Sequence, residues 1–154
     1  MQTIQILPVF PERPTNPART NVRTGDIEIN ASRWKELSPE TREFVLLHEV
    51  GHYKKQTFNE VEADRYALKH LSGKKPYSLW NYFNSVREVS YNNPERVSAA
   101  RRDVLEIAAD KGSKKAQLLL NRTANADGSG RTNMVKVVVI IALISIVIWI
   151  LMKK

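Results

Sequence analysis

The chain of 154 residues contains no cysteine. Disulfide bonds and thiolate chemistry are therefore excluded, although this absence does not define the cellular compartment. Only three histidines are present, so a site built on imidazole has few side chains to draw on. The first ten residues also lack the basic start and the long apolar core of a signal peptide. We therefore expect the main part of the chain to stay in the cytoplasm.

Two of the three histidines flank a glutamate in the segment His48-Glu49-Val50-Gly51-His52, which follows an apolar run at 44–47. Residues four apart share one face of a helix, so both imidazoles can bind the same metal ion. Glu49 could then accept a proton from a zinc-bound water, which ionises near pH ~7. This spacing is typical of zinc-dependent hydrolases. The rival interpretation is an amphipathic helix whose histidines have no metal-binding role.

Gly51 is an unusual residue within this helix, because glycine costs about 1 kcal/mol relative to alanine there. We expect another backbone, or a substrate, to approach closely at this position. A second helix is predicted from Asn59, as its N-cap, to about Leu71. Glu62 occupies the position of a capping-box partner for Asn59.

Glu60 and Asp64 share one face of this second helix, with the small residues Ala63 and Ala67 beside it. Catalytic zinc uses three protein ligands and leaves one position open. We therefore interpret Glu60 as the third ligand and Asp64 as the carboxylate that orients a ligand histidine. The alternative is an acidic first turn that complements the helix dipole. His70 lies off this face and is expected to be an ordinary helix residue.

The motif at 48–52 and the segment at 60–68, EVEADRYAL, together resemble the gluzincin metallopeptidases. They are most like the heat-shock protease X and prenyl-protein protease type, and compact minigluzincin domains. Glu60 and Asp64 match the Glu ligand and the following Asp of that family. The resemblance implies an α+β fold, with a small zincin-like domain that is mostly helical and has a short N-terminal sheet. It also implies that segment 25–30 is an edge strand that binds an extended substrate.

The sequence departs from the family pattern in the short connection between the two motifs, residues 53–59. A tight αα-hairpin could still bring Glu60 to the metal, because packed helices lie about 8–10 Å apart.

A second departure concerns a later His-Pro segment of the family, which is followed by an arginine that helps the transition state. The comparable segment here is Tyr91-Asn92-Asn93-Pro94, which lacks the histidine, with Arg101 beyond it. Tyr91, Asn92 and Arg101 are candidates for this role. Capping of a helix by Asn93 before Pro94 is the favoured interpretation of the segment itself.

Local signals predict the remaining elements. Ser38 and Pro39 start the motif helix, and Ile27 and Ile29 alternate with polar residues as in a half-buried strand. Further helices are predicted around 80–89, from 94 to about 111, and at 114–120. A step of three residues predicts an apolar core face on the first of these: Trp80, Phe83, Val86 and Val89. Prolines at every third residue predict an extended, irregular segment near the start: Pro8, Pro11, Pro14 and Pro17.

The sixteen residues from Val137 to Met152 are nearly all aliphatic, and Lys153 and Lys154 follow them. With residues 134–136 the run approaches the length that spans a hydrocarbon core of about 30 Å. We expect a single transmembrane helix that acts as a tail anchor over 134–154. The alternative is a buried helix of a soluble domain. The small, polar residues 121–133 predict a flexible linker, which leaves 1–120 as the metallopeptidase domain.

Basic side chains exceed acidic ones, and the net charge is +8. The basic residues are scattered, in pairs at most, and no aromatic–basic motif accompanies them, so no nucleic-acid binding is expected. A domain of this charge on a membrane would be attracted to anionic headgroups.

Together these features predict a membrane-tethered zinc metallopeptidase that hydrolyses peptide bonds of a protein or peptide substrate. The alternative is a non-catalytic, membrane-tethered scaffold or regulatory protein whose zinc site is structural or vestigial.

Overall fold

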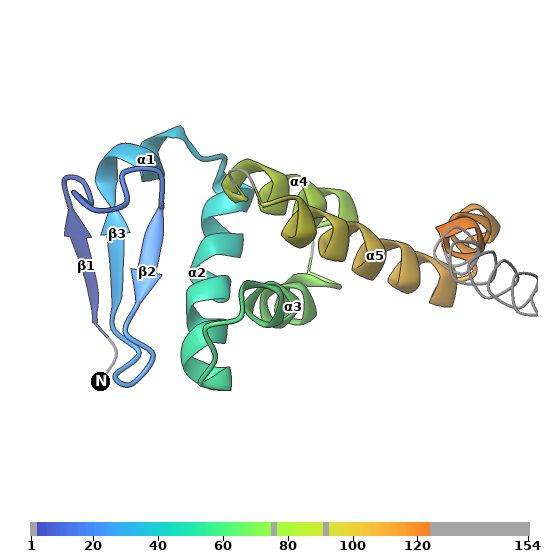
Figure 1. Ribbon diagram of the computed structural model, residues 1–154, viewed down its shortest axis with the longest axis horizontal. Coiled ribbons are helices and arrows are strands. Elements are labelled where there is room, and N and C mark those ends of the chain that lie inside the picture. Colours follow the sequence, from blue (N-terminus) through green and yellow to red (C-terminus); the bar gives the residue numbers. More distant parts are fainter. Residues whose placement is uncertain (1–2, 75–76, 91–92, 124–154) are drawn as a thin grey trace, which may run out of the picture. The chain divides into compact units, whose positions relative to one another are not determined.

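The computed structural model describes residues 3–74, 77–90 and 93–123. The chain groups into two compact units with the boundary after Val104. Three strands and five helices are labelled in Figure 1, and a further helical stretch follows at 114–123. The labelled elements are, in chain order, β1 (Ile4–Leu7), β2 (Ala18–Thr20), β3 (Ile27–Asn30), α1 (Ala31–Glu36), α2 (Pro39–Lys55), α3 (Glu60–Leu71), α4 (Leu79–Val89) and α5 (Pro94–Asp110). The expected α+β class, mostly helical with a short N-terminal sheet, is confirmed (Figure 1).

The sheet has the strand order β1-β3-β2, in which β3 pairs in parallel with β1 and antiparallel with β2. The expectation that segment 25–30 forms an edge strand is therefore wrong, because β3 is the central strand. The strand that lies next to α2 is β2, at the edge of the sheet (Figure 1). Only three residues long and with no alternating pattern, β2 gave no signal in the sequence.

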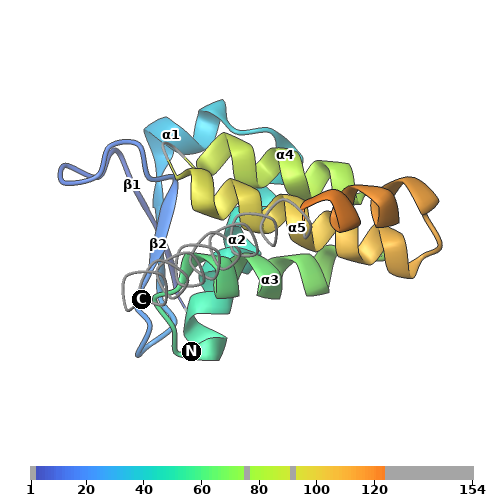
Figure 2. The ribbon, with the colours of Figure 1, turned by 45° about the vertical axis from the view of Figure 1, so that its right-hand side comes forward.

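Helix α2 lies between the sheet on one side and α3 on the other (Figure 1, Figure 2). Its predicted start is confirmed, since the Ser38 side chain accepts a hydrogen bond from the Thr41 N–H and Pro39 occupies the first turn. The helix ends at Gln56, whose left-handed backbone, with φ of 51°, turns the chain sharply toward α3. This turn is the short connection that the sequence required between the two motifs.

The predicted N-cap of α3 is confirmed, because the Asn59 side chain accepts hydrogen bonds from the N–H groups of Val61 and Glu62. The capping box is only half formed. The Asn59 N–H donates to Thr57 Oγ1 at 3.1 Å, which is the place that a Glu62 carboxylate would otherwise take. Thr57, two residues before the cap, thus accepts the hydrogen bond from the Asn59 N–H in place of Glu62.

The contact between α2 and α3 is close because its central residues are small. Ala63 and Ala67 are fully buried, as the sequence predicts. A Cβ atom added to Gly51 would lie 3.0 Å from the Ala63 carbonyl oxygen and 3.0 Å from Tyr66 Cβ. The expected close approach of another backbone at Gly51 is therefore confirmed.

The predicted apolar face of α4 is right only in part: Val86 is buried as predicted, whereas Trp80 is 65% exposed, and Tyr82 and Ser85 are buried although they were not predicted. The error has a geometric cause. Each step of three residues falls about 60° short of a full turn of the helix. Over the three steps from Trp80 to Val89 the shortfall adds up to about 180°, so these two side chains lie on opposite sides of the helix. The residues that share a face are those at steps of three and four together.

Helix α5 begins as expected, since the Asn93 side chain accepts a hydrogen bond from the Arg96 N–H. It ends at Asp110, before Gly112 with its φ of 88°. Residues 114–123 are helical up to the last residue described. None of the described helices is both long enough and apolar enough to cross a membrane. The predicted transmembrane segment, 134–154, and the linker beyond residue 123 lie outside the described residues.

Candidate metal centre

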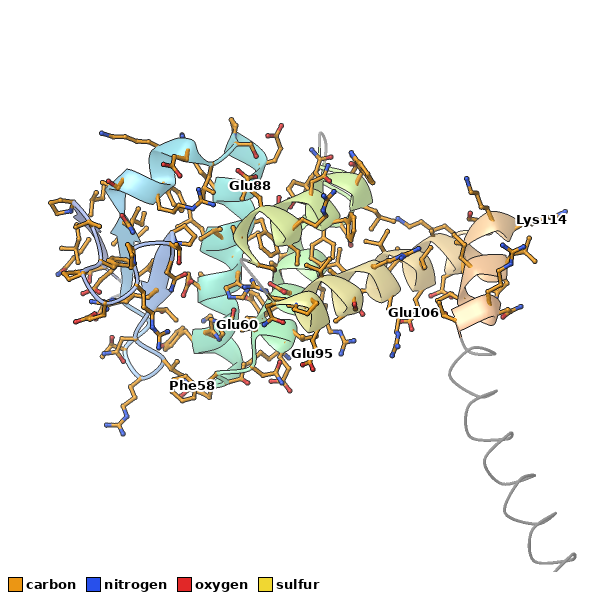
Figure 3. The ribbon with its side chains drawn as sticks, turned by 45° about the horizontal axis from the view of Figure 1, so that its top comes forward. Phe58, Glu60, Glu88, Glu95, Glu106 and Lys114 are labelled. Carbon is orange, nitrogen blue, oxygen red and sulfur yellow. The ribbon has the colours of Figure 1, made fainter. Side chains whose placement is uncertain are left out.

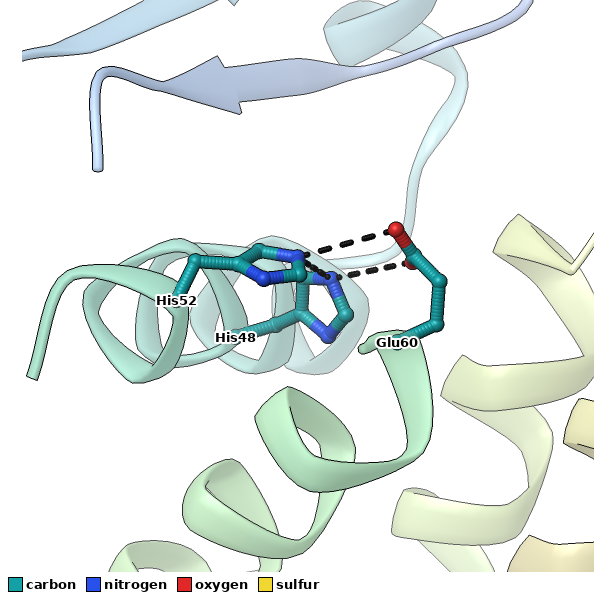
Figure 4. A group of neighbouring side chains, drawn as sticks. All are labelled: His48, His52 and Glu60. Carbon is teal, nitrogen blue, oxygen red and sulfur yellow. Dashed lines mark hydrogen bonds and ion pairs between the residues drawn. The ribbon is translucent and has the colours of Figure 1, made fainter. Parts of the chain in front are cut away.

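Three potential ligands come together where α2 passes the start of α3 (Figure 4). His48 and His52 project from α2, and Glu60 is the first residue of α3. Their ligand atoms all lie within 4.8 Å of one another, so this group could hold a metal ion. The structure thus brings together the three residues that the sequence predicted as ligands.

The separations between these atoms are near those expected around one metal ion. His48 Nε2 lies 3.0 Å from His52 Nε2 and 3.3 Å from Glu60 Oε2, and His52 Nε2 lies 3.7 Å from Glu60 Oε1. Ligand atoms on a tetrahedron with metal–ligand bonds of about 2.0–2.1 Å stand roughly 3.3 Å apart. The distances from His48 to His52 and to Glu60 are close to that value, and the distance from His52 is to the other Glu60 oxygen, so the group could hold a metal ion.

The other nitrogen of each histidine already has a partner. His48 Nδ1 lies 2.7 Å from Asp64 Oδ1, and His52 Nδ1 lies 2.9 Å from the Thr57 carbonyl oxygen. Each acceptor favours the tautomer with its proton on Nδ1, which leaves Nε2 free for a metal. Asp64 stands in the position that the sequence predicted for a carboxylate that orients a ligand.

Arg96, from the first turn of α5, is the residue at this site that sequence reasoning missed. Its Nε and Nη2 donate to the two oxygens of Asp64, both at 2.7 Å, and its Nη1 lies 2.9 Å from Glu60 Oε2. The side chains of Arg96 and Asp64 are 9% and 2% exposed, so this is a buried, bidentate ion pair. Arg96 therefore holds the carboxylate that in turn holds His48.

A signal for Arg96 existed in the sequence. A cation in the first turn of a helix opposes the helix dipole, so such an arginine needs another partner. The predicted site offered two carboxylates, Glu60 and Asp64. Arg101, the arginine singled out instead, is exposed and does not line the cleft beside the site. The other two transition-state candidates, Tyr91 and Asn92, lie outside the described residues.

Glu49 lines the same cleft as the two histidines and is buried, with 6% of its surface exposed. Burial is the main reason that its pKa rises to about 7, and the Glu60 carboxylate adds to the effect. His48 opposes the rise, as does a hydrogen bond from the backbone of Thr20 on β2. The carboxyl group of Glu49 can therefore exchange a proton near neutral pH.

The two histidines differ in their affinity for protons in the metal-free protein. Burial lowers the pKa of His48, but its hydrogen bonds to Asp64 and Glu60 outweigh burial and raise the pKa to about 9. The pKa of His52 is lowered, first by burial and then by the charge of His48. Burial raises the pKa of Glu60, yet the hydrogen bond and charge of His48 leave it below its usual value.

The site opens into a cleft with a volume of about 450 Å³. Three parts of the chain line it: α2, with Glu49 and both histidines; the segment 13–22, which includes β2; and the residues Phe58, Glu60, Val89 and Arg96. Phe58 is 84% exposed and lies in the turn between α2 and α3 (Figure 3). Glu62 and His70, which the sequence assigned no ligand role, are exposed and lie outside this cleft.

Comparison of the chain with models of protein families, with curated proteins and with solved structures finds no match in any of the three.

Proposed function

We propose that the protein is a zinc-dependent peptidase of the gluzincin type. One observation carries the proposal. Three ligand atoms from His48, His52 and Glu60 lie within 4.8 Å of one another, beside the buried carboxyl group of Glu49, in an open cleft.

The donor set favours zinc among the common metals. Two neutral imidazoles and one carboxylate form the ligand set of well-known zinc peptidases, whereas calcium and magnesium prefer oxygen ligands alone. When bound, zinc would polarise a substrate carbonyl and lower the pKa of a water molecule.

The protein's own residues would bind the metal and move the proton. Asp64 and Thr57 orient the two imidazoles, and Arg96 fixes Asp64. Glu49, whose carboxyl group is buried in the cleft, would take a proton from the attacking water and pass it to the leaving amine. Among the described residues, Glu49 is the one buried carboxylate that lines this cleft and is not a proposed metal ligand.

The substrate would be a polypeptide segment in an extended conformation. An edge strand can pair with such a segment through its free backbone groups, and the edge strand that lines the cleft is β2. The proposed substrate-binding strand is therefore β2 and no longer segment 25–30. This step uses analogy with how folds of this kind bind peptides.

The non-catalytic alternative predicts a closed metal site. Structural zinc sites have four protein ligands, whereas the group within the described residues contains three and faces a cleft. Glu49 also has no part in binding the metal. Both points favour the enzyme.

The proposal is tested with the purified full chain and a library of peptides analysed by mass spectrometry. We expect cleavage that a chelator abolishes and zinc restores. Glu60→Ala should lose the metal, measured as zinc per chain, while the matched change Glu62→Ala on the exposed side of α3 should keep it. Equal zinc content in the two variants would contradict the ligand assignment. Cleavage by the metal-free chain would contradict the proposed function.

The proposed setting is a membrane surface, with the aliphatic run at 137–152 as the anchor and the rest of the chain in the cytoplasm. A positively charged domain held there would also be attracted by anionic lipids.

A further inference from the structure

The prolines at every third residue near the start belong to the loop between β1 and β2, which forms part of the cleft wall. This loop is firmly held. Phe10 is fully buried, and the buried Asn30 donates from Nδ2 to the carbonyl oxygens of Pro14 and Asn16, each at 3.0 Å. The proline rings further restrict its backbone. The loop therefore presents its side chains to the cleft from a fixed position.

Arg13 is an exposed residue of this loop that lines the cleft. The other two arginines of the cleft are occupied: Arg19 pairs with Glu28 and Glu12, and Arg96 pairs with Asp64 and Glu60. Within the described ranges, no carboxylate lies at ion-pair distance from the Arg13 guanidinium. Arg13 thus leaves one uncompensated positive charge at the mouth of the cleft.

We propose that Arg13 selects substrates by binding a carboxylate, so that the cleft prefers peptides with an aspartate or glutamate at one position near the cleaved bond. The inference depends on the proposed peptidase function and adds a substrate class to it. A guanidinium is well suited to bidentate contact with a carboxylate. Because the loop backbone is already held, binding needs to order only the arginine side chain, and the cleft walls reduce the screening of its charge by water.

The test uses a library of random peptides in two measurements. In the first, the zinc-loaded wild-type chain cleaves the library, and the cleaved peptides are identified by mass spectrometry. In the second, the zinc-loaded Glu49→Gln chain retains peptides without cleaving them. We expect acidic residues to be enriched at one position in both sets, by about 3–10-fold over their amide counterparts.

Variants of Arg13 then identify the source of this preference. Arg13→Glu should reverse the preference, Arg13→Gln should abolish it, and Arg13→Lys should keep part of it. The matched control is Arg23→Glu, the same change of charge at an exposed residue that does not line the cleft. It should keep the full preference. Circular dichroism and zinc content confirm folding, and Arg13→Gln remains informative if Arg13→Glu does not fold.

The outcomes separate this inference from the proposed function. Retention of acidic peptides without any cleavage by the wild type would support the role of Arg13 and count against the peptidase. Cleavage of acidic and amide peptides at equal rates would overturn the role of Arg13 and leave the peptidase standing. The same preference in wild type and in Arg13→Gln would also overturn it.

Discussion

At the scale of single residues, the candidate metal centre is a chain of contacts that ends at Arg96. The guanidinium binds Asp64, Asp64 binds His48, and His48 presents its Nε2 toward His52 and Glu60. Each contact is charged or polar, and Arg96, Asp64 and His48 are buried, so loss of one member removes a hydrogen-bond partner from a buried neighbour in a region of low polarity.

Arg96→Met should therefore destabilise the metal-free protein by about 2–4 kcal/mol, because it leaves the buried Asp64 carboxylate with His48 alone. The matched control is Arg101→Met on the same helix, at an exposed position, where we expect a change within about 0.5 kcal/mol. Denaturant unfolding of both variants in the presence of a chelator measures the difference. Equal effects at the two sites would show that the ion pair of Arg96 contributes nothing to stability.

At the scale of elements, the site depends on how closely α3 approaches α2. Gly51 permits that approach, and the left-handed turn at Gln56 returns the chain quickly enough for Glu60 to face the histidines. The hairpin is further held by Gln56 Nε2, which donates to the Val22 carbonyl oxygen at 2.8 Å.

Gly51→Ala should destabilise the protein by about 1–2 kcal/mol, although alanine is the better helix former. The added methyl group would meet the backbone of Ala63, which cannot move without shifting α3. Lys54→Ala, at an exposed position of α2, controls for helix propensity and should change the stability by less than about 0.5 kcal/mol. Thermal unfolding compares the two. A more stable Gly51→Ala protein would mean that the two helices can separate freely.

Local signals were enough to predict most helices and the positions of the candidate ligands. Caps, prolines and ligand spacing are each defined by residues that lie close together in the sequence. Ser38 and Asn59 illustrate this, since each caps the helix that the sequence assigned to it. The order of the strands was out of reach, because it depends on the pairing of Ala18–Thr20 with β3, and β2 has no local pattern. Helix α1 was also missed: its six residues contain no buried side chain to give a periodic signal.

The candidate metal centre shows the same division between local and tertiary signals. His48, His52 and Glu60 come from two helices joined by a short turn. Their spacing along the sequence was therefore enough to predict that the three side chains meet. Arg96 comes from a helix more than thirty residues further along the chain, and its contact with Asp64 depends on tertiary packing. Only the unfavourable place of a cation in the first turn of α5 pointed to it.

At the scale of the whole molecule, a domain with a cleft is joined to an aliphatic C-terminal segment. The proposed anchor can be removed without touching the cleft. A chain that ends at Asn133 should remain in the supernatant after ultracentrifugation of a cell lysate, whereas the full chain should sediment with membranes and be released by detergent. Sedimentation of the truncated chain with membranes would contradict the tail anchor.

We propose that the cleft is the active site of a zinc peptidase and that Glu49 carries the proton. This proposal is tested most directly by Glu49→Gln, which keeps the shape of the side chain and removes its ability to accept a proton. We predict that this variant binds one zinc ion per chain, as the wild type does, while its rate of peptide cleavage falls by at least about 100-fold. Full zinc content with undiminished cleavage would contradict the account.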